Sequence, residues 1–266
     1  MCKIEARMDD ERYRKDVQWY TGILVVAVLA AFFLNLGALP LFNLDEGAFG
    51  EATREMFVRH DFLSTYLNGQ PRYDKPILIY WLQALSVSVL GLSEFALRLP
   101  SALAATAWVL VIYGFTRKLS DNRTALAAAI ITATTLEVLV IGKAATADAL
   151  LNLWITSAML AIYLYYHCRQ TRYLYLAYLA MALGFLTKGP VAVVIPLVVS
   201  LIFCALRGQL RFWLRAALHP GGIGVFLLVA LPWYVIEYFR DPEFFSGFFL
   251  QHNLNRFAEP MQSHGG

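Results

Sequence analysis

The chain has 266 residues, of which 59% are hydrophobic and 15% charged, and its mean hydropathy is +0.54. Soluble domains average roughly 45–50% apolar and about 25% charged residues, so this composition excludes an ordinary soluble domain and indicates a protein surrounded by membrane lipids. The net charge is only +3 and the cations are spread along the chain. A nucleic-acid-binding protein carries a basic stripe on one face, so no nucleic acid partner is expected.

The first hydrophobic segment predicts a retained membrane helix. Residues 1–19 carry charges of both signs and precede an apolar run over residues 20–42, which is of transmembrane length. The run exceeds the apolar part of a signal peptide, and no small-residue cleavage site follows it. Six further apolar runs bring the expected number of spans to about seven; they cover residues 99–116, 124–141, 149–166, 174–187, 190–206 and 222–239.

A large loop over residues 42–98 separates the first two spans. Its stretch GAFGEATREMFVRH predicts an amphipathic helix on the membrane surface, with Glu51, Glu55 and Arg59 on a solvated face. Ion pairs on such a face are common and contribute little, so these three side chains are expected to be structural.

The second half of this loop predicts a turn followed by another surface or re-entrant helix. Asn68-Gly69 marks the turn. The apolar run ILIYWLQALSVSVLGL that follows is short for a full span. Elsewhere, Gly37, Gly114 and Gly184 are candidates for close helix packing.

The orientation follows from the distribution of cations. With a cytoplasmic N-terminus, the loops on the same side hold most of the arginines, as the positive-inside rule requires. The chain then divides into a cytoplasmic segment 1–19, a transmembrane domain 20–240 and an external segment 241–266. The cations on the external side violate the bias and indicate a site that needs positive charge; they are Arg54, Arg59, Arg72, Lys75, Lys143, Lys188, Arg240 and Arg256.

Carboxylates at the external helix ends are the other candidates for function. Asp45 and Glu46 follow the first span and could act as a general base, as metal ligands or as partners of the neighbouring arginines. Asp45 could equally be the N-cap of the surface helix. Asp148 starts the fourth span. It could cap that helix, a role for which Thr146 competes, or it could contact the substrate, and the sequence favours the two roles equally.

Several sequence blocks together carry a family resemblance. They are NLDEGAFGEATREM, LNGQPRYDKPILIYWL, EFALRLPSAL, ATADALLNLW, GFLTKGPVAVVIP, LPWYVIEY and FFLQHNLNRFAEPMQSHGG. In this order they resemble the GT-C class of membrane glycosyltransferases, in particular bacterial relatives of protein O-mannosyltransferases and of the enzyme that transfers 4-amino-4-deoxy-L-arabinose to lipid A. Members are about twice this length, so the chain looks like an N-terminal portion.

The resemblance implies an all-α integral membrane fold and a glycosyltransferase activity. The donor would be a sugar on a polyprenyl phosphate such as undecaprenyl phosphate, and the acceptor a lipid A, glycan or protein hydroxyl. The site would lie on the periplasmic side of the bacterial inner membrane. Other classes remain open: a transporter or lipid flippase should have charges near the centres of its spans, and a non-catalytic scaffold would need no external cations.

The resemblance also assigns roles to single residues. Asp45 matches the aspartate that acts as base or orients the acceptor, with Glu46 beside it. Lys75 and Arg256 match cations that hold the carrier phosphate, and Lys188 is a further candidate. This chemistry suits the residue types, because cations stabilise a departing phosphate and a carboxylate can take the acceptor's proton. Direct displacement would invert the anomeric centre.

Four further residues complete the candidate site. Asp148 and Arg54 are possible substrate contacts. The lipid-A-modifying relatives place a metal at positions that match Asp74 and His252, so a zinc-like divalent ion is a possible cofactor. Those relatives have Glu where this chain has Asp74, and two protein ligands are few for a metal site. His252 could instead form a hydrogen bond at the external surface.

Overall fold

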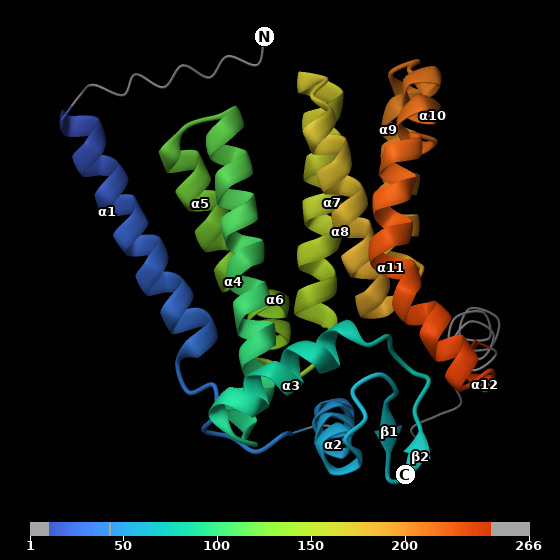
Figure 1. The fold of residues 1–266 in the computed structure, drawn as a ribbon. Helices are drawn as coiled ribbons and strands as arrows, with labels where there is room; N and C mark the ends of the chain where they lie inside the picture. The colour runs from blue at the N-terminus through green and yellow to red at the C-terminus, as the bar shows by residue number, and fades with distance from the viewer. Residues whose placement is uncertain (1–10, 43, 246–266) are drawn as a thin grey trace, which may run out of the picture.

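The computed structural model describes residues 11–42 and 44–245, which are almost entirely helical. Long helices form a bundle, and a layer of shorter elements crosses one end of it (Figure 1). The bundle contains α1 (Glu11–Val28) with η1 (Leu29–Phe33), α4 (Glu94–Leu119), α5 (Asn122–Thr134), α6 (Leu136–Lys143), α7 (Asp148–Cys168), α8 (Thr171–Lys188), α9 (Val191–Leu206) and α11 (Pro220–Arg240).

The end layer is built from the large loop between the first two spans. It contains α2 (Leu44–Arg59), the strands β1 (Tyr66–Leu67) and β2 (Gln70–Pro71), and α3 (Leu78–Leu90). The short α12 (Glu243–Phe245) follows α11 on this side, whereas α10 (Leu210–Ala217) lies at the opposite end of the bundle (Figure 1).

All seven predicted spans are helical, which confirms the all-α membrane fold class. By length and composition, three helices of the described part of the chain can cross a membrane unaided, namely α4, α7 and α11. Together, α5 and α6 count as a fourth span that is bent by 63°. The other predicted spans correspond to α1 with η1, α8 and α9, which are shorter or less apolar.

Threonine side chains cause the bend between α5 and α6. The hydroxyls of Thr132, Thr134 and Thr135 donate to carbonyl oxygens one turn earlier, at 2.7–2.8 Å. Such bonds compete with the backbone ladder and often bend helices. Thr135 is extended (φ −63°, ψ 129°), so the continuous helix predicted over residues 124–141 is in fact two helices.

Small residues allow the bundle helices to approach closely. On α5, Ala125, Ala129 and Ala133 recur every four residues and are fully buried. Four-residue spacing places them on one face of the helix. This pattern is typical of membrane helices, because small side chains let the backbones come together.

Two of the three predicted packing glycines lie at tight contacts. A Cβ added at Gly37 would lie 2.8 Å from the Cβ of Phe95, and one at Gly184 would lie 2.6 Å from the Cβ of Ala192. A Cβ at Gly114 would meet no atom within 4 Å. The prediction is therefore confirmed for Gly37 and Gly184 and wrong for Gly114.

The end layer has its own turn and its own buried face. Asn68 and Gly69 adopt positive φ values of 53° and 81°, which a two-residue hairpin turn requires, and this confirms the predicted turn. Glu55 was expected on a solvated face, but its side chain is buried. It accepts hydrogen bonds from the Gly69 amide at 3.0 Å and from Arg59 at 3.0 Å. Glu55 thus fixes the hairpin to α2.

Candidate active site

Charged side chains converge on one small cavity where the end layer meets the bundle. Its volume is about 100 Å³. The lining residues come from α2, the segment before α3, the loop after α6, the start of α7 and the end of α8: Asp45, Phe49, Asp74, Lys75, Thr146, Ala147, Asp148 and Lys188. The structure therefore brings together five of the residues predicted from the sequence.

The ends of α7 and α8 contribute an ion pair. The Nζ of Lys188 donates to Oδ1 of Asp148, and the hydroxyl of Thr146 donates to Oδ2 of the same carboxylate at 3.2 Å. Asp148 is the first residue of α7 and makes no capping bond, because the N-cap position is Ala147. The capping interpretation of Asp148 is therefore wrong, and its carboxylate faces the cavity residues instead.

The motif Leu-Thr-Lys-Gly-Pro explains why Lys188 lies at this position. Gly189 has a positive φ of 74° and ends α8. Pro190 directly precedes the first residue of α9. Glycine after a helix and proline at the start of the next are the residues these positions favour. The tight helical connection thus holds Lys188 at the end of its helix, beside the cavity.

The segment before α3 contributes a second cluster of charges. The Nζ of Lys75 donates to Oδ1 of Asp74 at 2.6 Å, and Arg72 donates to Oδ2 at 3.0 Å. The guanidinium of Arg72 also lies 5.4 Å from the centre of the Phe49 ring. The sequence places Arg72 among the external cations but gives it no specific role, although its position two residues before Asp74 in PRYDKP is a visible signal.

Asp45 differs from the other charged residues around the cavity. It is the second residue of α2, so it lies inside the helix rather than at the N-cap position, and its side chain is exposed. Across residues 11–42 and 44–245, no hydrogen bond or ion pair engages its carboxylate. The carboxylate of Asp45 is therefore accessible to a ligand.

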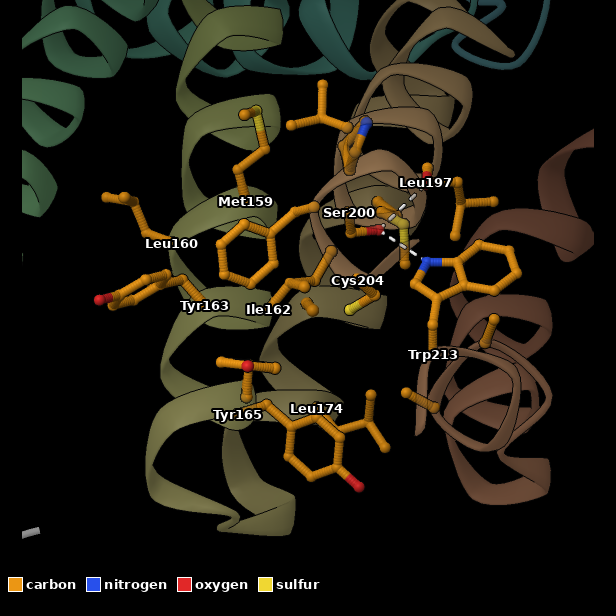
Figure 2. Close-up of a pocket in the computed structure, with 18 of the residues that line it drawn as sticks. Met159, Leu160, Ile162, Tyr163, Tyr165, Leu174, Leu197, Ser200, Cys204 and Trp213 are labelled. Atoms are coloured by element: carbon orange, nitrogen blue, oxygen red, sulfur yellow. Dashed lines mark hydrogen bonds between the residues drawn. The ribbon is translucent and has the colours of Figure 1, made fainter. Parts of the chain in front are cut away.

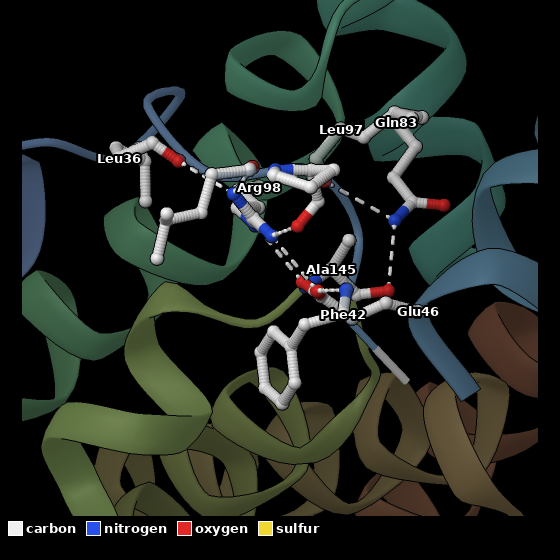
Figure 3. A network of polar contacts seen from close by, with 9 residues as sticks. Leu36, Phe42, Glu46, Gln83, Leu97, Arg98 and Ala145 are labelled. Atoms are coloured by element: carbon white, nitrogen blue, oxygen red, sulfur yellow. Dashed lines mark hydrogen bonds and ion pairs between the residues drawn. The ribbon is translucent and has the colours of Figure 1, made fainter. Parts of the chain in front are cut away.

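Glu46, next to it, has a different environment (Figure 3). Its side chain is fully buried and accepts bonds from Nε and Nη2 of Arg98 at 3.0 and 2.9 Å, from the Ala145 amide at 2.6 Å and from the Phe42 amide at 3.1 Å. Burial opposes ionisation, but these donors outweigh it and keep the pKa of Glu46 below its ordinary value. The geometry supports a structural role for Glu46 rather than the expected catalytic one.

A wider set of hydrogen bonds fixes the loop between α6 and α7. Gln83 of α3 donates to the carbonyl of Ala145 at 3.3 Å and accepts a bond from Thr53 of α2 at 2.8 Å. Ser101 of α4 donates to the carbonyl of Thr146 at 3.0 Å. Three elements thus hold the loop that leads directly into Asp148.

The remaining predicted residues lie elsewhere. Arg54 pairs with Glu51 at 2.7 and 2.8 Å on the exposed face of α2, and it does not line the cavity. Arg256 and His252 lie outside the described residues. Their predicted contacts with the carrier phosphate and with a metal therefore stay predictions.

The donor groups on the described residues do not form a metal centre. No group of three His, Cys, Asp or Glu side chains comes together in residues 11–42 and 44–245. Asp74 is engaged by Arg72 and Lys75, which reduce its ability to bind a cation. The expected Asp74–His252 pair supplies too few ligands for a metal ion by itself.

A second set of polar contacts ties the end layer to α11. Asp61 accepts two bonds from Arg240, at 2.8 and 3.1 Å, and Ser64 donates to Glu237 at 2.9 Å. Partial burial opposes ionisation of Asp61, but the Leu63 amide and Arg240 outweigh it and lower the pKa of this carboxyl. These contacts anchor the end layer to α11.

The fold and the cavity define a multi-pass helical membrane protein with a charged site at one end of its bundle. A family model described as dolichyl-phosphate-mannose-protein mannosyltransferase matches residues 74–236, which is more than half of the chain. The chain belongs to this family.

Individual relatives agree with this assignment. The undecaprenyl phosphate-alpha-4-amino-4-deoxy-L-arabinose arabinosyl transferase 1 of Pseudomonas fluorescens is 29% identical over 93% of this chain and 46% of the relative. The crystal structures of ArnT from Cupriavidus metallidurans share the fold at 24% identity. The apo form gives a TM-score of 0.82 over 88% of this chain and 44% of that one, and the form bound to undecaprenyl phosphate gives 0.80 over 89% and 44%. The chain thus spans less than half the length of these relatives.

Proposed function

We propose that the protein transfers a monosaccharide from a polyprenyl-phosphate carrier to an acceptor hydroxyl, and that the charged cavity is its active site. The observation that carries the proposal is the convergence of Asp45, Lys75, Asp148 and Lys188 from separate segments on one cavity. The names of the relatives support the choice of donor, since one is a transferase named for an undecaprenyl phosphate sugar and another was crystallised with undecaprenyl phosphate.

The reaction needs two kinds of group, and the cavity offers both. The acceptor oxygen attacks the anomeric carbon of the sugar while the bond from that carbon to the phosphate oxygen breaks. The acceptor's proton passes to a carboxylate, and the electron pair of the broken bond leaves with the phosphate. Asp45 is the candidate base because its carboxylate is exposed and has no partner in the described part of the chain.

The cations would stabilise the departing phosphate. Lys75 and Lys188 each contact an aspartate, so a phosphate group can take the place of the carboxylate as the lysine's partner. The lining residues carry two lysines against three aspartates, which does not favour an anion. We therefore include Arg72, which contacts Asp74, and Arg256, which lies outside the described residues, among the groups that balance the phosphate.

The placement of the charges does not favour a transporter. Asp148 is the first residue of α7 and Lys188 is the last residue of α8. Transport sites lie near the midplane of the bilayer, in broken helices. Here the charged residues gather at helix ends, as expected of an enzyme that acts at the membrane surface.

The proposal includes the cellular side of the site. The loops at the α10 end of the bundle carry the arginine-rich segments, and the positive-inside rule assigns that end to the cytoplasm. The end layer and the helix ends that line the cavity lie at the other end (Figure 1), which would put the site on the periplasmic face of a bacterial inner membrane. Lipid A, a glycan and a protein hydroxyl remain candidate acceptors. A zinc-like ion between Asp74 and His252 also remains a proposal.

A donor-binding and transfer experiment tests this function on the full-length protein. Purified protein in nanodiscs would be incubated with a panel of undecaprenyl-phosphate-linked sugars, and transfer would be measured beside the binding of a non-transferable donor analogue. Lys75→Ala should weaken both donor binding and turnover, because the phosphate contact persists from ground state to transition state. Arg54→Gln is the matched control, since it removes one cation from the exposed face of α2, in the same end layer but outside the cavity. Donor binding by Lys75→Ala equal to that of the wild type would contradict the assignment.

A further inference from the structure

A second, larger cavity lies among α7, α8, α9 and α10 (Figure 2). Its volume of about 450 Å³ falls within the range of small-molecule sites, roughly 300–1,000 Å³. The walls are aromatic and aliphatic; representative residues are Met159, Tyr163, Leu174, Met181, Phe203 and Trp213. Because α10 lies at the end of the bundle opposite the end layer, this cavity is separate from the proposed active site (Figure 1).

Specific hydrogen bonds build the wall that α10 contributes. The indole Nε1 of Trp213 donates to the Ser200 hydroxyl of α9 at 2.9 Å, and that hydroxyl donates to the Leu197 carbonyl at 3.0 Å. The hydroxyl of Tyr178 on α8 donates to the carbonyls of Ala216 and Ala217 at 3.0 and 2.7 Å. These polar groups satisfy one another, so the surface left to a ligand is apolar.

The segments that form most of this cavity's wall, α7 to α10, are basic at this end. Residues 149–236 contain no aspartate or glutamate. The arginines of α7 to α10 and their connections are all exposed, and none lies within 4 Å of a carboxylate in the described part of the chain; they are Arg169, Arg172, Arg207, Arg211 and Arg215. This charge is complementary to an anion.

Two of these arginines lie directly against the cavity wall. The guanidinium carbon of Arg169 is 3.8 Å from the centre of the Phe212 ring, and that of Arg207 is 5.6 Å from the centre of the Phe203 ring. Both rings line the cavity. A ligand with an apolar tail in the cavity would therefore have its polar end beside these cations.

The segment around α10 has the pattern of a helix at the membrane surface. Within α10, Arg211 and Arg215 and next to them Leu210 and Leu214 recur with a spacing of four residues. Arg207 in the preceding turn and Leu218 at the C-cap continue this spacing in the sequence. The three leucines are 46–67% exposed. A basic row next to an exposed apolar row is typical of interfacial helices that contact anionic lipids.

We propose that this cavity binds one acyl chain of an anionic phospholipid, with the headgroup held by the surrounding arginines. Lipid tails are as apolar as the cavity wall, so an acyl chain gains little by leaving the bilayer. Selectivity must come from the headgroup, which basic residues attract near a membrane surface. The site therefore distinguishes anionic from zwitterionic lipids, and the distinction weakens at high salt.

Photolabelling of the full-length protein tests this proposal. The protein would be placed in phosphatidylcholine nanodiscs that contain a trace of phosphatidylglycerol or phosphatidylcholine with a diazirine on one acyl chain. After irradiation, labelled peptides would be mapped by mass spectrometry. We expect the phosphatidylglycerol probe to label peptides of α7–α10 that line the cavity at least about fivefold more than the phosphatidylcholine probe.

Two variants with matched controls separate the acyl site from the headgroup site. Ala216→Phe should fill the cavity and abolish its labelling, whereas Leu214→Phe, on the exposed row of α10, should leave labelling unchanged. Replacing Arg207, Arg211 and Arg215 by glutamine should remove the preference for phosphatidylglycerol. Arg123→Gln, in the turn between α4 and α5, should retain this preference. Thermal unfolding of each variant would verify that it folds.

Three outcomes of the labelling with the two lipid probes would overturn the proposal. They are equal labelling by the two probes in the wild type, labelling of Ala216→Phe equal to that of the wild type, and the absence of label from the cavity peptides. The last outcome is expected if another segment of the full-length protein covers the cavity. Selective labelling by a polyprenyl-phosphate probe in place of phosphatidylglycerol would also contradict it.

Discussion

At the scale of single residues, Asp45 and Glu46 show how two adjacent carboxylates acquire different roles. Asp45 is exposed at the cavity, whereas Glu46 is fully buried and bonded to Arg98. Successive helix residues point about 100° apart, so one faces the site and the other faces α4. The acidic pair is visible in the sequence, but the division of roles depends on Arg98, which lies more than fifty residues away.

Arg98 should be essential for the end layer to stay docked. Its guanidinium also donates to the carbonyls of Leu36, Leu39 and Pro40 at 2.7–3.0 Å. Arg98→Gln would leave Glu46 buried without its cation, which typically costs about 3–5 kcal/mol. Glu46→Gln should cost less, about 1–3 kcal/mol, because Arg98 then loses its anion but keeps the carbonyls of Leu36, Leu39 and Pro40 as acceptors.

Thermal unfolding of the variants in detergent would measure these differences in stability. Arg54→Gln is the control, because Arg54 pairs with Glu51 on the exposed face of α2, where an ion pair contributes little to stability. A loss of stability in Arg98→Gln no larger than in this control would show that the Glu46–Arg98 pair does not hold the layer.

At the scale of elements, the sequence predicted helices better than it predicted their ends and contacts. Apolar runs located every span and the turn at Asn68-Gly69. The break at Thr135 is not predicted from the sequence. A run of threonines is compatible with a continuous helix, and the sequence does not show that the hydroxyls bond to the backbone. The sequence predicts no helix between the spans 190–206 and 222–239, where α10 lies, since the arginines there mask the apolar side chains that face the bundle.

The close contact of α8 with α9 gives an element-scale prediction. An added methyl at Gly184 would lie 2.6 Å from the Cβ of Ala192, so Gly184→Ala should push the two helices apart and destabilise the protein by about 1–3 kcal/mol. Because Lys188 lies one turn further along α8, donor binding should weaken as well. Gly114→Ala is the matched control: its methyl meets open space, and the better helix propensity of alanine should raise stability by up to about 1 kcal/mol.

Both variants would be compared by thermal unfolding and by binding of the donor analogue. Equal stability of Gly184→Ala and Gly114→Ala would show that the α8–α9 packing tolerates the methyl, and the steric explanation for Gly184 would have to be abandoned.

At the scale of the whole molecule, the site depends on contacts between distant segments. Asp45, Lys75, Asp148 and Lys188 span more than 140 positions, yet they line one cavity. The charge bias and the helix ends made all four candidates, and the family resemblance gave roles to Asp45, Lys75 and Lys188. No local spacing could predict that they meet. The structure adds Arg72 and Thr146 and moves Arg54 away from the site. The roles of Arg256 and His252 stay predictions.

The transmembrane orientation predicts opposite accessibilities for two exposed turns. Asn68 lies in the hairpin of the end layer, whereas Ser120 follows α4 at the other end of the bundle (Figure 1). A cysteine at position 68 should react with a membrane-impermeant thiol reagent in intact cells, and one at position 120 should react only after permeabilisation. The reverse pattern would invert the topology and place the cavity in the cytoplasm.

The most direct measurement of the central claim compares chemistry with binding in the full-length Asp45→Asn variant. The amide preserves the shape of the side chain but removes the base. Single-turnover transfer should therefore fall by about 10²-fold or more, while the affinity for a non-transferable donor analogue stays within a few-fold of the wild type. Loss of donor binding with an unchanged chemical step would contradict the account and would make Asp45 an organiser of the donor site.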